Sequence, residues 1–426
     1  MAIFSFSTST ETISKPRRFE YKNFILPKRN IRAPVEFEQI RVCAIIPAYK
    51  PTVLTERLIE DLLRWSPNIT VCVVDDCTPY SEESVRIFES IRAISLERVA
   101  VIRTPMNRLK AGALNYGLEH VWSKDGQHPD VILTLDDDIV IEPSTVRNLV
   151  TELMAHEDMG AVCSQCHVLN KNKNLLTRLQ GLEYLGFNAT RLADEGFYMG
   201  PLVMHGMLTA FRTIALRQAG GFSEGHLIED YEVTTRLKVK GWSVKSALNA
   251  HAWTIVPENF SKLWRQRARW SYGGITVVDN VKHLPSVLQD VIGHAMFWAM
   301  LGAINLLALG ILFRSGGGIS SGIPYWIIAL SLAQFGIWFV FQLWLMRLYK
   351  EKDGYDWLIR LSVIPEFAYA NLLTLVLVGS YFFLFFKTLT RKITERSISV
   401  MQKIKLYGSA AFRTFGYTEN WGTRAQ

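Results

Sequence analysis

The chain has 426 residues, of which 49% are hydrophobic, and a mean hydropathy of +0.11. This is high for a soluble enzyme, and the apolar excess lies after about Val287, so we expect a soluble half followed by a membrane half. The net charge is +8, and two clusters of basic residues flank apolar segments. This favours anionic lipid headgroups over nucleic acid as a partner. Five cysteines are few and odd in number, which argues against a disulfide framework.

The first 40 residues are polar and basic, and we expect them to form an extension on the protein surface. Residues 1–14 lack the pattern of a secretory signal peptide. From Arg41 onward, short apolar runs alternate with amphipathic stretches. The predicted strands are 42–46, 70–74, 99–102 and 131–135, and the predicted helices are 55–65 and 111–122. This alternation predicts an α/β domain with a mostly parallel sheet and helices on both faces.

Acidic residues follow the fourth predicted strand, and ligands of such sheets bind outside the carboxyl ends of the strands. Asp136 and Asp138 are two apart, so in an extended chain their carboxylates face the same side. A hard divalent cation binds carboxylates together with phosphates, and it would neutralise a departing diphosphate. The pair therefore indicates a nucleotide and metal site, although a solvated acidic turn explains it equally well.

Asp75 and Asp76 close the second predicted strand, where a carboxylate could accept hydrogen bonds from a ribose or a base. Taken alone, this pair favours a structural role. Lys110 begins residues 110–115 (Lys-Ala-Gly-Ala-Leu-Asn), which lie at the start of a predicted helix. Small residues there let the backbone approach a phosphate and the lysine adds positive charge, but a plain helix start is an equal alternative.

Glu229 and Asp230 follow a glycine-rich stretch and precede a predicted helix over residues 231–240. A helix cap is one explanation, because acidic residues are favoured at helix N-termini. A sugar-transfer reaction also needs a carboxylate that accepts the proton of the acceptor hydroxyl as it attacks the anomeric carbon. The two roles are compatible.

Residues 266–270 (Gln-Arg-Ala-Arg-Trp) lie in a stretch of helical character. Gln266, Arg269 and Trp270 would share one helical face. The planar guanidinium suits a diphosphate, and the indole offers a flat wall to a sugar ring. An amphipathic helix anchored at lipid headgroups is the alternative.

The order and separation of these motifs resemble those of the family 2 processive glycosyltransferases, which include hyaluronan, chitin, cellulose and poly-N-acetylglucosamine synthases. The resemblance runs from Arg41 to about Gly274, and each motif is weak by itself. The motifs are 73–76 (Val-Val-Asp-Asp), 110–115, 136–138 (Asp-Asp-Asp), 220–222 (Gly-Gly-Phe), 229–230 (Glu-Asp) and 266–270.

This resemblance implies a GT-A fold and a single-displacement, inverting hexosyltransferase that takes a nucleotide sugar, usually a UDP-sugar, with Mg²⁺ or Mn²⁺. It implies that Asp230 is the catalytic base and Asp138 the metal ligand. The implied donor-binding residues are Asp75, Asp76, Lys110, Asp136, Gln266, Arg269 and Trp270. The expected acceptor is a growing β-linked polysaccharide. Single-sugar transfer to a lipid or a short glycan is the alternative, and an inactive GT-A-like scaffold or binding module is a third reading.

Three apolar segments after the motifs are long enough to cross a bilayer. They are 291–313, 325–346 and 367–386, with a glycine-rich loop at 315–322 and an amphipathic stretch at 357–364. We therefore expect a GT-A domain over 41–282, a transmembrane region of two or three spans over 283–386 and a basic tail over 387–426. The predicted location is the cell membrane, with several spans and a cytoplasmic catalytic domain.

The basic tail conflicts with three full crossings. Residues 387–426 contain eight Lys or Arg against two Glu, which favours the cytoplasmic side, whereas three crossings would place the tail outside. One apolar segment is therefore expected to lie in the interface, or residues 357–386 to enter and return. Three spans are too few to enclose a polymer channel, so a homo-oligomer or an accessory membrane subunit would complete one. Residues 421–424 (Trp-Gly-Thr-Arg) resemble a tail motif of hyaluronan- and chitin-type synthases, with a disordered end as the alternative.

Overall fold

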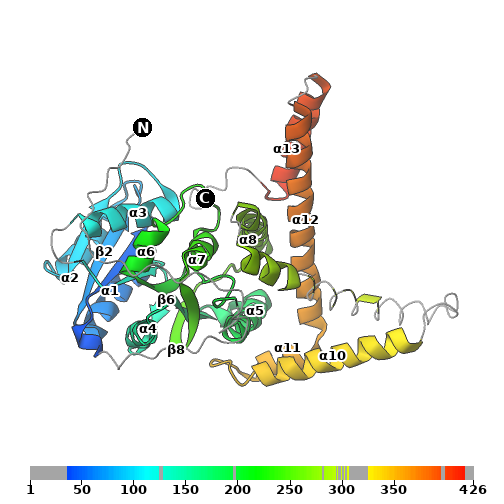
Figure 1. The fold of residues 1–426 in the computed structure, drawn as a ribbon, viewed down its shortest axis with the longest axis horizontal. Coiled ribbons are helices and arrows are strands. Elements are labelled where there is room, and N and C mark those ends of the chain that lie inside the picture. The colour runs from blue at the N-terminus through cyan, green and yellow to red at the C-terminus, as the bar shows by residue number, and fades with distance from the viewer. Residues whose placement is uncertain are drawn as a thin grey trace.

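The computed structural model describes residues 36–123, 128–194, 198–280, 283–293, 325–394 and 399–417, together with positions 295, 299, 302, 305 and 306 (Figure 1). Its centre is an eight-stranded sheet of order β3-β2-β1-β4-β7-β6-β8-β5. The strands are β1 (Val42–Ala48), β2 (Ile69–Asp75), β3 (Val99–Arg103), β4 (Val131–Leu135), β5 (Val140–Ile141), β6 (Met159–Val168), β7 (Leu208–Arg212) and β8 (Ser243–Thr254).

The sheet is parallel at one end and mixed at the other. β1 pairs in parallel with β2 and β4, so that Val42 lies opposite both Ile69 and Val131, and β2 pairs in parallel with β3. β7 runs antiparallel to β4 and β6, and β5 runs antiparallel to β8, whereas β6 and β8 are parallel. The predicted α/β class is confirmed, and the antiparallel pairs are an addition that the alternation of predicted elements did not indicate.

Helices cover both faces of this sheet (Figure 1). Leu58 of α1 and Ile87 of α2 belong to the core on one face, and Leu114 of α3 and Leu216 of α6 to the core on the other. The strands between them are apolar on both sides, as a doubly covered sheet requires. The helices of this half are α1 (Val53–Trp65), α2 (Glu82–Ile94), α3 (Leu109–Trp122), α4 (Thr145–Met154), α5 (Leu175–Ala193), α6 (Thr213–Ala219) and α7 (Glu229–Val239), with 3-10 turns at Phe37–Gln39 and Lys171–Lys173.

The local backbone explains where two of the predicted helices begin. The side chain of Thr52 accepts a hydrogen bond from the Leu54 amide, and the Thr55 hydroxyl accepts one from the Thr52 amide, so α1 begins two residues before the predicted start. The helix predicted at 111–122 begins at Leu109, which has a positive φ of 60°. That unusual backbone turns the chain so that Lys110 lies in the first turn of α3.

The labelled helices that follow the sheet are α8 (Phe260–Asn280), α10 (Tyr325–Leu345), α11 (Gly354–Ser362), α12 (Ile364–Thr394) and α13 (Ser399–Thr414). Among the described residues, one helical stretch, Ile364–Thr390, is long and apolar enough to cross a membrane, and Leu332–Leu345 is a shorter apolar stretch. The predicted segments at 325–346, 357–364 and 367–386 correspond to α10, α11 and α12. Most of residues 1–40, most of the predicted span at 291–313, the loop at 315–322 and the motif at 421–424 lie outside the described residues.

Candidate active site

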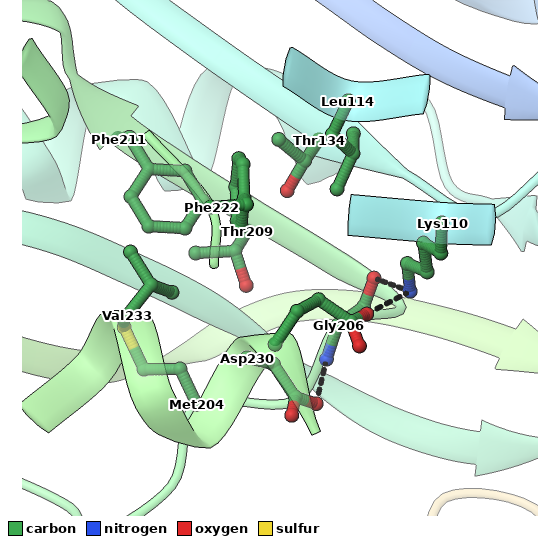
Figure 2. Close-up of a pocket in the computed structure, with 11 residues that line it drawn as sticks. Lys110, Leu114, Thr134, Met204, Gly206, Thr209, Phe211, Phe222, Asp230 and Val233 are labelled. Carbon is green, nitrogen blue, oxygen red and sulfur yellow. Dashed lines mark hydrogen bonds and ion pairs between the residues drawn. The ribbon is translucent and has the colours of Figure 1, made fainter. Parts of the chain in front are cut away.

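Motifs distant in the sequence meet at the carboxyl edge of the central strands. Lys110 comes from α3, Asp136 follows β4, Gly206 precedes β7, and Glu229 and Asp230 begin α7. Figure 2 shows Lys110, Gly206 and Asp230 around a small pocket with an apolar floor. The pocket holds about one water molecule, so it is the base of a site and not the space for a whole donor.

Lys110 connects three parts of this site. Its Nζ lies 2.6 Å from an Asp136 carboxylate oxygen and 3.3 Å from a Glu229 carboxylate oxygen, and it donates a hydrogen bond of 2.9 Å to the Gly206 carbonyl. Burial alone would lower the pKa of this ammonium, but the surrounding carboxylates outweigh it and hold the pKa above the ordinary lysine value. Lys110 therefore carries a fixed positive charge, which a phosphate can share.

Asp230 lies in the first turn of α7 with its carboxylate aimed at the loop before β7. One oxygen accepts a hydrogen bond of 2.7 Å from the Gly206 amide, and the other accepts one of 2.7 Å from the Tyr231 amide. Burial and the neighbouring Glu229 carboxylate raise the pKa of Asp230 to about 6 despite the Lys110 charge and these hydrogen bonds. A carboxylate with this pKa is suited to accept a proton near neutral pH.

Glu229 has the opposite behaviour. Burial would raise the pKa of its carboxyl group, but the charges of Lys110 and Arg269 outweigh it and lower that pKa. Glu229 is therefore an ion-pair partner, whereas the ionised form of Asp230 is disfavoured by its surroundings. Two adjacent carboxylates with separated pKa values are the usual sign of a division between structural and acid–base roles.

The three carboxylates after β4 crowd together. Burial and the neighbouring charges of Asp136 and Asp137 raise the pKa of Asp138 to about 7. Asp136 is held by Lys110, whereas Asp138 is half-buried beside it. Within the described residues no cluster of three His, Cys, Asp or Glu side chains has the arrangement of a metal site. Asp138, crowded by neighbouring carboxylates, nonetheless fits Mg²⁺ or Mn²⁺, because these ions take one or two protein carboxylates and the phosphates of a substrate.

Asp75 and Asp76 are buried and hold internal contacts. Asp75 forms an ion pair of 2.6 Å with Arg103 and accepts a hydrogen bond of 2.8 Å from the Thr78 amide. Asp76 is fully buried, and one of its carboxylate oxygens accepts hydrogen bonds of 2.7 Å from the Arg108 amide and 3.2 Å from the Thr104 hydroxyl. Both residues therefore shape the loops beside the strand ends, and their predicted contacts with a donor stay a prediction.

The motif helix α8 brings one of its three predicted residues to the carboxylates. Arg269 donates a hydrogen bond of 3.2 Å to the Leu227 carbonyl and contributes to the low pKa of Glu229. Gln266 accepts a hydrogen bond of 2.6 Å from Arg267, and the Arg267 guanidinium lies 4.1 Å from the centre of the Trp270 ring. In this structure Gln266 and Trp270 are thus held by Arg267, which comes from the buried side of the helix.

Arg267 is a site residue that the sequence did not reveal. Arg267 is 5% exposed, and its guanidinium forms a bidentate contact with Glu183 of α5, at 3.1 and 2.6 Å. The hydroxyl of Tyr369 on α12 donates a hydrogen bond of 2.7 Å to the same carboxylate. These contacts join the motif helix to α5 and α12. An arginine within the 266–270 motif was the available signal, but its partners are distant in sequence.

Gly206 and Asn115 were also missed. A Cβ atom at Gly206 would lie 2.7 Å from the Lys110 Nζ atom and 3.2 Å from Asp230, so a larger residue would displace the lysine from its partners. Asn115 accepts a hydrogen bond of 2.8 Å from the Phe222 amide and donates one of 2.7 Å to the Phe222 carbonyl. It thereby fixes the 220–222 motif against the 110–115 motif, which explains in part why both occur together.

Comparison with known proteins identifies the class to which this fold belongs. The profile of Glycosyl transferase family 2 matches residues 43–217, and that of Glycosyl transferase family group 2 matches residues 131–341. The chain belongs to family 2 of the glycosyltransferases.

Similar proteins include bacterial synthases. A poly-beta-1,6-N-acetyl-D-glucosamine synthase of Staphylococcus epidermidis is 27% identical over 173 residues, which are 41% of this chain and 40% of that protein. The corresponding enzyme of Staphylococcus aureus (strain COL) is 27% identical over 172 residues, 40% of each chain. The aligned region therefore spans less than half the length of these relatives.

A solved structure resembles the fold over more of the chain. The mannosyltransferase PcManGT of Pyrobaculum calidifontis, in complex with GDP-Man and Mn²⁺, has a TM-score of 0.54 and 18% sequence identity. The match covers 84% of this chain and 92% of that one. At this identity the likeness supports the GT-A fold, which the sequence had predicted.

Proposed function

We propose that this chain is a membrane-bound, inverting hexosyltransferase that moves a sugar from a nucleotide sugar, a UDP-sugar, onto a growing β-linked polysaccharide. The observation that carries the proposal is that a candidate base and a candidate diphosphate site lie together. Asp230 has a pKa of about 6, and Lys110 with the carboxylates after β4 offers a place for a diphosphate. A base on one side and a leaving-group site on the other are what a single displacement requires.

The chemistry follows from these positions. The Asp230 carboxylate accepts the proton of the acceptor hydroxyl while the oxygen attacks the anomeric carbon, and the nucleoside diphosphate departs on the opposite face. Lys110 and Arg269 hold the negative charge that develops on the diphosphate. Asp138, with Asp136 beside it, would hold Mg²⁺ or Mn²⁺, which supplies charge neutralisation on the phosphates. Asp75, Asp76, Gln266 and Trp270 are proposed to complete the donor site.

The acceptor is inferred from the relatives. The two staphylococcal proteins are poly-beta-1,6-N-acetyl-D-glucosamine synthases, which favours a polysaccharide acceptor. The alternative is transfer of one sugar to a lipid or a short glycan. We place the enzyme in the cell membrane with a cytoplasmic catalytic domain, because nucleotide sugars are made in the cytoplasm and Ile364–Thr390 is apolar. Membrane lipids are partners, and a second copy or an accessory membrane subunit would complete an export path.

The test uses the full chain purified in detergent or in its own membranes. Labelled UDP-sugars are supplied singly with Mg²⁺ or Mn²⁺, and the product is sized. We expect long chains from one donor, loss of activity in EDTA and recovery with either metal. A monoglycosylated lipid as the product would favour the alternative acceptor, a lipid or a short glycan. Transfer that proceeds unchanged in EDTA would contradict the metal. Absence of transfer from every donor, together with a cellular function that Asp230→Asn leaves intact, would favour the inactive scaffold.

A further inference from the structure

The helix α12 has two apolar faces, and only one of them packs on protein. Tyr369, Val376 and Phe383 are buried, at positions seven residues apart. The opposite side is open to solvent: Leu375 is 60% exposed, Phe382 63% and Phe385 65%. Leu389, 44% exposed, continues this stripe after a further turn. The high hydropathy of α12 therefore comes from one protein-facing and one outward-facing stripe.

The inner stripe lies along the motif helix over most of the apolar stretch. At one end the Tyr369 hydroxyl reaches Glu183, which holds Arg267 of α8. Further along, the rings of Phe383 and Tyr272 of α8 are 5.0 Å apart, and Lys387 donates a hydrogen bond of 3.4 Å to the Tyr272 hydroxyl. From 369 to 387, α12 thus runs beside the catalytic domain for about 27 Å.

The charged residues of α8 argue against a position of α8 and α12 deep in the bilayer. α8 contains Lys262, Arg265, Arg267 and Arg269, and Arg269 acts on the Glu229 carboxylate of the active site. If α12 crossed the bilayer, α8 would enter the hydrocarbon with it. Charged side chains in the bilayer centre are strongly unfavourable, and the nucleotide site needs water.

The chain after α12 also returns along it. The rings of Phe386 and Phe412 of α13 are 5.2 Å apart, and the hydroxyl of Tyr417 donates a hydrogen bond of 2.6 Å to the Val376 carbonyl. The indole of Trp264 on α8 donates one of 2.7 Å to the Phe415 carbonyl. Figure 1 shows α13 folded back beside α12, whereas α10 runs away from the catalytic domain.

We propose that α12 does not cross the membrane but lies in the plane of its interface, with the stripe of Leu375, Phe382, Phe385 and Leu389 in the acyl chains. This rests on the membrane location of the proposed function. The helix α10 enters the bilayer instead, and its 21 residues extend about 30 Å, enough to reach the far side. With the span predicted at 291–313 as the first crossing and α10 as the return, the basic tail then stays on the side of the catalytic domain. Its eight Lys and Arg residues contact anionic headgroups there, which removes the conflict with the charge of the tail.

The test measures the depth of spin labels in the full chain, reconstituted in vesicles of phosphatidylcholine with anionic phosphatidylglycerol. Cys77, which is half-buried, is first changed to Ser. Single cysteines replace Leu375, Phe382 and Leu389 on α12, which are seven residues apart. Matched cysteines replace Ile337 and Trp344 on α10, which are 74% and 50% exposed and also seven residues apart. Depth is read from the ratio of collisions with oxygen and with a water-soluble nickel complex.

We expect the three α12 labels to have one shallow depth, and the two α10 labels to differ by roughly 10 Å. A depth that changes steadily along α12 would overturn the inference and leave the membrane location intact. Labels that all contact water alike would contradict the membrane location itself, and the inference with it.

A second measurement determines the side of the tail. Tyr407→Cys on α13, at a residue 72% exposed, and Leu96→Cys in the catalytic domain, at one 89% exposed, are treated with a membrane-impermeant maleimide in sealed vesicles. We expect the two cysteines to react in the same fraction of molecules. Reaction at Tyr407→Cys only in those vesicles where Leu96→Cys is protected would place the tail on the opposite side and overturn the inference.

Discussion

Two pairs of adjacent carboxylates, Asp75–Asp76 and Glu229–Asp230, occupy similar positions beside the sheet but have different surroundings. Asp76 is fully buried and accepts hydrogen bonds from Arg108 and Thr104. Asp230 is also buried and accepts two amide hydrogen bonds, but its burial and the neighbouring Glu229 carboxylate raise its pKa to about 6. The two residues differ in their neighbours: loop donors hold Asp76, whereas Asp230 lies beside a second buried carboxylate, which leaves it suited to act as a base.

The largest effect is expected at the base. Asp230→Asn keeps the size of the side chain but cannot accept the acceptor proton, so kcat should fall by about 10³-fold. Initial rates with saturating donor and acceptor measure this loss.

Stability separates this loss from unfolding. The folded state binds the Asp230 proton more tightly than the unfolded state does, so ionisation between about pH 4 and 6 weakens the fold. At pH 7.5 the Asn variant should therefore unfold at the same or a higher temperature. A variant that is inactive because its melting temperature has collapsed would contradict the assignment.

The second prediction concerns the structural pair. Asp76→Ala leaves the half-buried Arg108 amide and the buried Thr104 hydroxyl without their acceptor and should lower the free energy of unfolding by about 3 kcal/mol. Asp76→Asn retains an acceptor oxygen and should lose about half as much. Thermal unfolding in detergent, followed by tryptophan fluorescence, measures both. An Asp76→Ala protein as stable as the wild type would remove the contrast between the two pairs.

The third prediction concerns Gly206, in the loop that contacts both Lys110 and Asp230. A methyl group at Gly206 would lie 2.7 Å from the Lys110 Nζ atom, so Gly206→Ala should displace this lysine and raise KM for the donor by about tenfold, equivalent to ~1.4 kcal/mol. Gly225→Ala is the matched control, because an added methyl group there meets no atom within 4 Å. Equal donor KM values for the two variants would exclude a role for the close approach of Gly206.

The parallel and the mixed halves of the sheet also differ in what the sequence could predict. The parallel strands and their carboxylates were predicted because apolar runs ending in acidic residues leave a local signal, as at Asp136. The β6–β8 half was not, since β7 pairs antiparallel with strands distant in the sequence. Gly206 and Arg267 were missed for the same reason: the contacts that define them come from other elements, at Lys110 and Glu183.

The smallest effect is a shift in pH dependence. The wild-type kcat/KM should fall as pH drops through about 6, because the Asp230 carboxylate becomes protonated. The Lys110 charge lowers the pKa of Asp230, so Lys110→Met should move this acid limb to higher pH, by about one unit. Profiles of kcat/KM from pH 4.5 to 8.5, each scaled to its own maximum, separate the shift from weaker donor binding. An acid limb that stays in place would mean that Lys110 acts on the donor alone, and that the reactivity of Asp230 comes from burial and Glu229.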